Sequence, residues 1–460
     1  MTDIEFAWSA LGGDPALLRR VTTTVREGAL VGRLPVRESA RICVGVCALA
    51  AAELAARREG LARVPGVRVD DGAVATAFTS ERRLRIAGRE PVSFAPLSRF
   101  WRTADGWLRT HANYPHHRRR LLAALDLPAD PALVAAALRE RSAPEVEEAV
   151  YAAGGLAVAL RTPAQWAAHE QGAAVARHPL VARERLDSTP GRVLTPAPAG
   201  AASPAAGLRV LDLTRVIAGP VATRTLALLG ADVLRVDPPG LPELPDQHAD
   251  TGFGKRSATL DLTSDGAAFE ELLAGADVVV TGYRPGALDR FGLSPQALAE
   301  RRPGLVVAQL SAWGADGPWA GRRGFDSLVQ AATGIAVVEG SAERPGALPA
   351  QALDHGTGQL LAAAVLRSLT DRSREGGSRL VRLSLARTAA WLLDGVRPDD
   401  TGGAGREHAG AYPGPEPWLA ERDSPLGRLR YALPPVSYAG GPADWARPPG
   451  PWGVDAAAWR

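Results

Sequence analysis

The sequence is poor in the residue types that build thiol and metal chemistry. Its 460 residues include two cysteines and one methionine. Cys43 and Cys47 lie four residues apart in an apolar stretch with helical spacing, where they would share one helix face as small buried hydrophobes. A zinc site needs several ligands close together, and none accompany this pair. The sequence therefore predicts no metal site.

A long apolar run is also missing. The longest, Ile42–Ala52, ends at Glu53 and is short of the roughly 20 residues that cross a bilayer. No charged-then-apolar leader opens the chain. We therefore expect a cytoplasmic protein with no membrane partner.

Charge of one sign is not gathered anywhere. The 53 basic and 50 acidic side chains give a formal net charge of +3, and the arginines are interleaved with acids, so nucleic acid is not an implied partner. Scattered arginines can still bind a phosphorylated small molecule. His111, His116 and His117 have no further ligands at helical spacing and are followed by three arginines, so we expect solvated surface histidines.

What the sequence does contain is an alternation of strand and helix patterns. Strand-like runs at 208–213, 231–236, 258–262, 277–281 and 304–310 are separated by helical segments. This alternation predicts an α/β fold with a mainly parallel, doubly wound sheet of Rossmann-like type. The first turn lacks the G-x-G-x-x-G fingerprint, which disfavours nicotinamide and flavin cofactors. Ligands of such sheets bind at the carboxyl ends of the strands, here the turns 214–220, 282–286 and 311–317.

The chain divides into four parts by composition and pattern. Residues 1–92 are expected to form a helical lead-in and a partial copy of the catalytic-helix region of the large domain. Residues 93–186 read as a small α+β domain, and 187–207, rich in Pro, Ala, Gly and Ser, as a linker. Residues 208–460 form the large domain with a C-terminal extension.

The partial copy is inferred from internal similarity. Glu38–Gly60 and Asp354–Gly376 have the same length and pattern, and Glu38 aligns with Asp354. Two explanations stand. Either two alanine-rich helices resemble each other by composition, or the chain contains a truncated duplication.

One carboxylate stands out in the large domain. In Ala352–Gly358, "ALDHGTG", Asp354 lies where a loop enters an alanine- and leucine-rich helix, among small residues that permit close approach to the backbone. Asp354 either caps this helix or presents its carboxylate to a ligand. Local sequence alone leaves both roles open.

Four stretches in order resemble a known family. They are "VLDLTRVIAGPVATRTLALLGADVLRVD" (210–237), "GKRSATLDL" (254–262), "GYRPGALDRFGLS" (282–294) and "LDHGTGQLLAAAVLRSLTDRSREGG" (353–377). They are similar to the motifs of the class III CoA-transferases, the CaiB/BaiF family. "FWRTADGW" (100–107) resembles that family's small domain, which in family members follows the catalytic helix, whereas here it precedes the large domain. A truncated tandem arrangement accounts for this order.

The resemblance implies a mechanism and its partners. Asp354 would be the nucleophile that attacks an acyl-CoA, so that a mixed anhydride and then an aspartyl-CoA thioester form before a carboxylic acid accepts the CoA. Coenzyme A is then a substrate and not a bound prosthetic group, and a homodimer is implied. The small residues Gly356 and Gly358 would admit the thioester, with backbone N–H groups nearby for the oxyanion. His355 either orients Asp354 or faces away.

The resemblance also assigns the CoA-binding positions. Val216 and Ile217 would contact the adenosine. Tyr283 and Arg284 would line its pocket. Lys255 and Arg290 would meet the phosphates.

Two other functions remain as alternatives. The related 2-methylacyl-CoA racemases exchange an α-proton with a histidine and an aspartate, the histidine lying in a Gly-His-Asp motif. The matching residues here are Gly324-Phe325-Asp326, and phenylalanine cannot exchange a proton, although His355 leaves an opening. A non-catalytic CoA-binding protein, with Asp354 as a helix cap only, is the second alternative.

Overall fold

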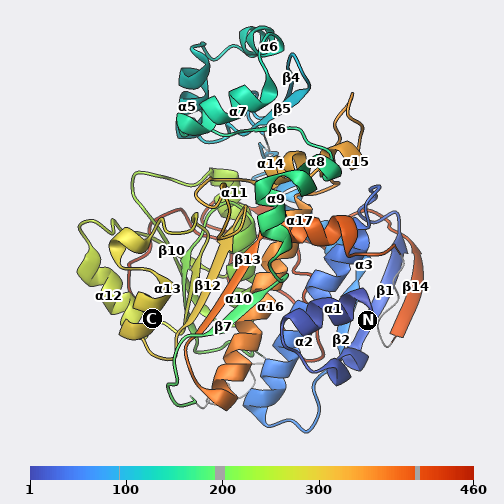
Figure 1. Ribbon diagram of the computed structural model, residues 1–460. Helices are drawn as coiled ribbons and strands as arrows, with labels where there is room; N and C mark the ends of the chain where they lie inside the picture. The colour runs from blue at the N-terminus through green and yellow to red at the C-terminus, as the bar shows by residue number, and fades with distance from the viewer. Residues whose placement is uncertain (93, 192–202, 399–404) are drawn as a thin grey trace.

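The computed structural model describes residues 1–92, 94–191, 203–398 and 405–460. Most of the expected linker 187–207 lies outside the described residues. Three bodies are visible in Figure 1: a main sheet with its helices, a smaller N-terminal sheet beside it, and a small lobe above both.

The main sheet has seven strands in the order β10-β9-β8-β11-β12-β13-β7. Its strands are β7 (Ala182–Arg185), β8 (Arg209–Leu213), β9 (Asp232–Asp237), β10 (Arg256–Thr259), β11 (Val278–Thr281), β12 (Val306–Ser311) and β13 (Arg379–Ser384). Strands β8 to β13 are parallel, and β7 adds antiparallel to β13. When the six parallel strands are numbered 1 to 6 along the chain, their order across the sheet is 3-2-1-4-5-6, an order that occurs in doubly wound sheets. The expected α/β class with a mainly parallel sheet is confirmed.

Helices cover both faces of this sheet. Alternate strand residues point to opposite faces, and they divide between two apolar clusters: Val210 belongs to the cluster with α10 (Ala218–Leu228) and α16 (Ala352–Glu375). Leu211 belongs to the cluster with α12 (Gly266–Gly275) and α13 (Pro295–Arg301). The loops at the strand ends are thereby held between two packed layers.

The N-terminal region is less helical than expected. It comprises α1 (Asp3–Ala10), η1 (Pro15–Arg20), β1 (Val21–Glu27), α2 (Val36–Glu59), β2 (Val67–Asp70), α3 (Asp71–Ala77), α4 (Ser80–Arg83) and β3 (Arg85–Ile86). Strand β1 lies between β2 and β14 (Gly405–Ala411) in a parallel sheet. The helical lead-in is therefore wrong at β1, whose β-branched run "VTTTV" favours a strand.

Helices α2 and α16 lie side by side between the two sheets (Figure 1). Each has 24 residues. Helix α2 is followed by β2 and α3, and α16 by β13 and α17 (Leu385–Asp394), so both segments have the same order of elements. This shared order agrees with the partial-duplication explanation, which stays a prediction.

Helix α2 is the one helix in the described part of the chain with the length and apolarity of a bilayer span. All of its most apolar window is buried inside the protein. A core helix that packs on all sides meets the same criteria.

The small lobe has its own core above the carboxyl ends of the main strands (Figure 1). It contains β4 (Phe100–Arg102), β5 (Trp107–Thr110), α5 (Pro115–Leu125), α6 (Pro131–Arg139), α7 (Ala143–Ala152) and β6 (Ala157–Ala159), with the strands antiparallel. The next elements, α8 (Pro163–Ala168), α9 (Glu170–Ala176) and β7, connect it to the main body. The α+β unit is thus shorter than 93–186.

The remaining elements are short and complete the fold. They are α11 (Pro245–Thr251), η2 (Asp289–Phe291), α14 (Asp326–Ala332), α15 (Ile335–Val338), η3 (Glu416–Trp418), β15 (Leu419–Arg422) and β16 (Leu429–Ala432). Strand β16 pairs with both β15 and β3, so the C-terminal region is bound to the N-terminal one. Helix α4 is thereby held next to the start of α16, where Glu81 contacts His355.

Candidate functional site

Asp354 is the third residue of α16 and lines a cavity of about 340 Å³. It is 5 % exposed, and within the described ranges no hydrogen bond reaches its carboxylate. The cap of α16 is supplied by Asp326, at the start of α14, whose Oδ2 accepts the N–H groups of Leu353 (2.9 Å) and Asp354 (3.0 Å). Asp354 therefore does not cap its helix by hydrogen bonding, and its carboxylate is available to the cavity.

The surroundings of Asp354 favour its neutral form. Burial, followed by repulsion from Asp326 and Glu81, raises the pKa of Asp354 well above its usual range. Burial also raises the pKa of Asp326, although the N–H groups and Gln330 that bond to it oppose this shift. Because Asp326 has these donors and Asp354 has none among the described residues, Asp354 is the more readily protonated of the two.

His355 faces away from Asp354. Its Nε2 lies 3.2 Å from Glu81 Oε2, on α4 of the N-terminal region, and its ring stacks on Phe78 at 5.2 Å between centroids. Burial opposes ionisation of Glu81, but the contact with His355 lowers the pKa of Glu81 overall. The N-terminal region thus contributes an acid beside the nucleophile candidate.

The glycines after Asp354 have a different role from the expected one. A Cβ on Gly358 would lie 2.5 Å from the Ala218 carbonyl oxygen, and one on Gly356 would meet Cys43 Sγ at 3.5 Å. These positions allow α10 and α2 to pack closely on α16 and do not open a path for a thioester. The expected oxyanion donors are also partly occupied, since Asp326 accepts two N–H groups of the first turn.

Val216 and Ile217 lie in the loop between β8 and α10, and both line the cavity of Asp354. Their expected contact with adenosine stays a prediction. Val216 has φ of 70°, which is strained for a β-branched residue. Its N–H donates to Glu243 Oε2 at 3.1 Å. Together with Phe325, Val216 also lines a second cavity, so these two residues separate the two spaces.

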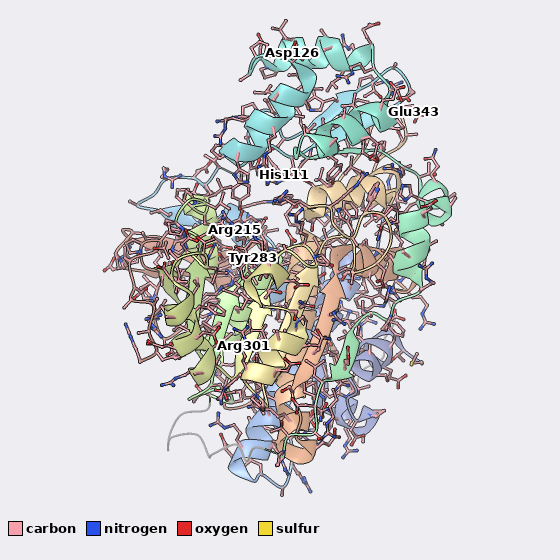
Figure 2. All side chains as sticks on the ribbon, turned by 60° about the vertical axis from the view of Figure 1, so that its left-hand side comes forward. His111, Asp126, Arg215, Tyr283, Arg301 and Glu343 are labelled. Carbon is pink, nitrogen blue, oxygen red and sulfur yellow. The ribbon has the colours of Figure 1, made fainter. Side chains whose placement is uncertain are left out.

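The second cavity measures about 710 Å³ and contains three more of the expected residues, Tyr283, Arg284 and Arg290. Its lining includes two aspartates but six arginines: Arg120, Arg215, Arg284, Arg290, Arg322 and Arg323. In the described chain, no carboxylate forms a salt bridge with four of them: Arg120, Arg284, Arg290 and Arg323. Figure 2 shows Arg215 and Tyr283 below the small lobe, with His111 at its base. Unpaired guanidinium groups in a cleft suit phosphate groups.

Lys255 does not reach this cavity. Its ammonium is buried and donates to Asp212 Oδ2 (2.9 Å), to the Pro220 carbonyl (2.9 Å) and to Thr223 Oγ1 (2.6 Å). These bonds use all three donors of the amine. The expected phosphate contact of Lys255 is therefore wrong, and Lys255 instead ties β8 to α10.

The expectation of solvated histidines is wrong for two of the three. His111 is 5 % and His117 is 4 % exposed, while His116 is half-buried. Burial, helped by Arg109, lowers the pKa of His111 to about 3. The His111 ring stacks on Phe325 with 3.8 Å between centroids, and both line the cavity of Asp354. Sequence reasoning missed this neutral imidazole because a tertiary contact alone brings it to the site.

The small lobe is fixed over the site through Glu243. Glu243 is buried and accepts hydrogen bonds from Tyr114 of the lobe, from Arg235 Nη2 (2.9 Å) and from the Val216 N–H. Burial opposes ionisation, but Arg235 and Arg215 lower the pKa of Glu243 to about 2. Glu243 therefore remains charged and fixes both the lobe and the strained loop.

Cys43 and Cys47 are buried free thiols, as expected. Within the described ranges, no group of three or more histidine, cysteine or acidic side chains could hold a metal ion.

Comparison with known proteins finds similarity to one family over part of the chain. Residues 206–412 match the model of CoA-transferase family III. The chain is 37% identical over 210 residues to a probable fatty acyl-CoA transferase of Mycobacterium tuberculosis, covering 42% of this chain and 52% of that protein. It is 37% identical over 161 residues to an acetyl-CoA:oxalate CoA-transferase of Acetobacter aceti, covering 32% and 41%.

A solved CAIB/BAIF family protein from Brucella suis is 28% identical, and the match covers 43% of this chain and 59% of that protein with a TM-score of 0.38. The chain spans about half the length of the M. tuberculosis relative. Residues 206–412, which contain the four motifs and Asp354, are thus similar to CoA-transferase family III.

Proposed function

We propose that this protein transfers CoA between an acyl-CoA and a carboxylic acid, with Asp354 as the nucleophile. The observation that carries this proposal is a buried carboxylate with no hydrogen-bond donor among the described residues, in a cavity that adjoins an arginine-lined one. The arginine-lined cavity would hold the phosphates of CoA. The family match over 206–412 supports the same activity.

The reaction would proceed by covalent catalysis. The Asp354 carboxylate attacks the thioester carbonyl, which gives a mixed anhydride and releases CoA thiolate. The thiolate then attacks the aspartyl carbonyl, which releases the donor acid and leaves an aspartyl-CoA thioester. The acceptor carboxylate attacks that thioester, and the released thiolate attacks the new acyl group, so that Asp354 and a new acyl-CoA are formed.

The first step needs ionised Asp354, whereas burial and the neighbouring acids favour its neutral form. The positive end of the α16 dipole favours negative charge at this position, and a low-dielectric cavity strengthens that effect. The rate is therefore expected to rise with pH until Asp354 is ionised.

Hydroxylamine trapping tests the proposal directly. The protein is incubated with a panel of acyl-CoAs and hydroxylamine, which converts activated carboxylates into hydroxamates, and is then mapped by peptide mass spectrometry. Modification confined to Asp354 supports the proposal. Modification at Glu38 would move the reaction to the N-terminal region, and no modification in protein that binds CoA would refute the nucleophile.

A racemase-like reaction is the second candidate, because His111 brings an imidazole into the cavity of Asp354 although Phe325 occupies the motif position. A neutral imidazole can accept an α-proton. Exchange of the α-hydrogen of 2-methylacyl-CoA in D₂O, lost in His111→Gln, would favour this reaction. CoA binding without either reaction would favour a non-catalytic protein.

The resemblance further leads us to propose a homodimer in the cytoplasm, and the strand order leads us to propose a Rossmann-like large domain. Light scattering at several concentrations tests the dimer: a mass near 48 kDa would refute it.

A further inference from the structure

The wall of the Asp354 cavity includes a segment that none of the motifs covers. This segment is part of the connection between β3 and β4, and it contributes Pro91, Val92, Phe94 and Ala95 to the lining. Val92 is 74% and Phe94 is 41% exposed, although both are apolar. Apolar side chains left open on the wall of a cavity favour a ligand that can cover them.

Val92 and Ala95 are held in place by hydrogen bonds from their backbone N–H groups. The Val92 N–H donates to Asp246 Oδ2 at 3.0 Å, and the Ala95 N–H donates to Asn113 Oδ1 at 3.0 Å. The guanidinium of Arg109 lies 5.2 Å from the Phe94 ring. The apolar side chains are therefore anchored from both the main body and the small lobe.

The charges of the same cavity are unbalanced toward the negative. Its lining has two arginines, Arg82 and Arg89, against three acids besides Asp354, whose neutral form is favoured: Glu81, Asp246 and Asp326. Arg89 bonds with both guanidinium Nη atoms to the two oxygens of Asp246. Arg82 Nε lies 3.5 Å from Glu81 Oε1, and Arg82 Nη1 donates to the Pro349 carbonyl at 2.9 Å. Both cations of the described lining are thus already engaged.

We propose that this cavity selects uncharged, apolar acyl groups, with Val92 and Phe94 as specificity-determining contacts, and rejects acyl groups that carry a second carboxylate. A second carboxylate would lose its water without gaining a free cation and would meet excess negative charge. An aliphatic or aromatic chain would cover Val92 and Phe94. This inference rests on the proposed function, because it names the class of acid that Asp354 would activate.

Binding of unreactive thioethers tests the selection without turnover. Hexyl-CoA and 3-carboxypropyl-CoA carry the same CoA and differ in the end of the chain. By calorimetry, we expect hexyl-CoA to bind at least about tenfold more tightly, from apolar burial alone. Equal or tighter binding of the carboxylated thioether would overturn the inference.

Two variants examine the apolar contacts. Val92→Ser and Phe94→Ser are each expected to weaken hexyl-CoA several-fold and to leave the affinity for free CoA unchanged. Leu133→Ser is the matched control, because Leu133 is 47% exposed on α6 and outside the cavity. Unchanged hexyl-CoA affinity in both cavity variants, or an equal loss in the control, would contradict the assignment.

Asp246→Asn examines the charge. Asparagine can still accept the Val92 N–H, but Arg89 loses its carboxylate partner, so the preference for hexyl-CoA over the carboxylated thioether should shrink several-fold. Asp423→Asn is the control, since this exposed acid pairs only with Arg428 on the surface among the described residues. If Asp246→Asn leaves the ratio of the affinities for hexyl-CoA and 3-carboxypropyl-CoA unchanged, the charge of the cavity does not contribute to the selection.

Acyl exchange separates this inference from the proposed function. Transfer of succinyl or oxalyl groups faster than hexanoyl groups would overturn the inference and leave the CoA-transferase proposal intact. Tight discrimination between the thioethers, without hydroxamate at Asp354 from any acyl-CoA, would support the cavity preference and refute the nucleophile.

Discussion

Glu38 and Asp354 occupy the same place in two helices of equal length, and their surroundings differ. Each is the third residue of its 24-residue helix and is nearly fully buried. Glu38 accepts two hydrogen bonds from Arg37, at 2.9 and 2.6 Å. Asp354 faces a cavity with Asp326 and Glu81 nearby and no cation bonded to it within the described ranges. Sequence position places the carboxylate, and the neighbouring charges decide whether it is structural or reactive.

The cations show the same contrast between a paired and an unpaired charge. Lys255 is buried and fully paired, whereas Arg323 lines the large cavity without a carboxylate partner in the described chain. Buried, paired charges hold elements together, while unpaired charges in a cleft are available to a ligand.

The largest expected effect comes from exchanging the two carboxylates for amides. Asp354→Asn should lower the rate of acyl exchange by about 10³-fold or more and retain CoA binding, because the nucleophile is lost and the cavity is not. Glu38→Gln should retain the exchange rate per folded molecule. Steady-state kinetics with equilibrium dialysis of CoA measures both, and equal losses in the two variants would contradict the comparison.

The paired cation should matter for stability. Lys255→Met leaves Asp212 charged and buried, so we expect the free energy of unfolding to fall by about 3–5 kcal/mol without a specific change in the KM for acyl-CoA. Urea denaturation gives the first quantity. A raised KM at unchanged stability would return Lys255 to the binding site.

The unpaired cation should matter for binding. Arg323→Gln removes a proposed phosphate partner, and we expect a rise of about tenfold in the KM for acyl-CoA with little change in stability. Arg428→Gln is the control, because Arg428 pairs with surface acids. No difference between the two variants would argue that phosphates bind elsewhere.

A smaller effect is expected in the pH dependence. Because Asp326 raises the pKa of Asp354, Asp326→Asn should shift the rising limb of kcat/KM toward lower pH, and asparagine can still cap α16. Asp326→Ala should shift the limb in the same direction and also lower stability by about 0.5–2 kcal/mol through loss of the cap. If the rising limb of kcat/KM stays at the same pH in both variants, Asp326 does not raise the pKa of Asp354.

The smallest expected effect is on stability. The folded-state pKa of Asp354 lies above its unfolded value, so this group destabilises the fold increasingly as pH rises above the ordinary Asp value of about 3.9. Asp354→Asn should therefore be more stable than the wild type at pH 7, and the difference should vanish below about pH 3.9. Thermal unfolding across pH measures this, and a less stable variant at pH 7 would contradict the raised pKa.

Much of the large domain follows from the sequence. The parallel strands at 209–213 and 278–281 are apolar runs bounded by turns, and such patterns depend on neighbours within a few residues. Tyr283, Arg284 and Arg290 reach the large cavity because the carboxyl ends of parallel strands meet at one edge. The β-branched run of β1 also favours a strand, contrary to the helical lead-in predicted for this region.

The sequence by itself determined the α/β class, the family motifs and the carboxylate in the first turn of α16, because each is encoded in a short stretch of chain. Tertiary structure alone decided the rest of the site. It brought Glu81 to His355, His111 to Phe325 and the cap from Asp326. It also buried Lys255 against Asp212, whereas the sequence predicts a contact between Lys255 and a phosphate. These contacts join residues from tens to hundreds of positions apart, and burial and pairing of charge exist only once such residues meet.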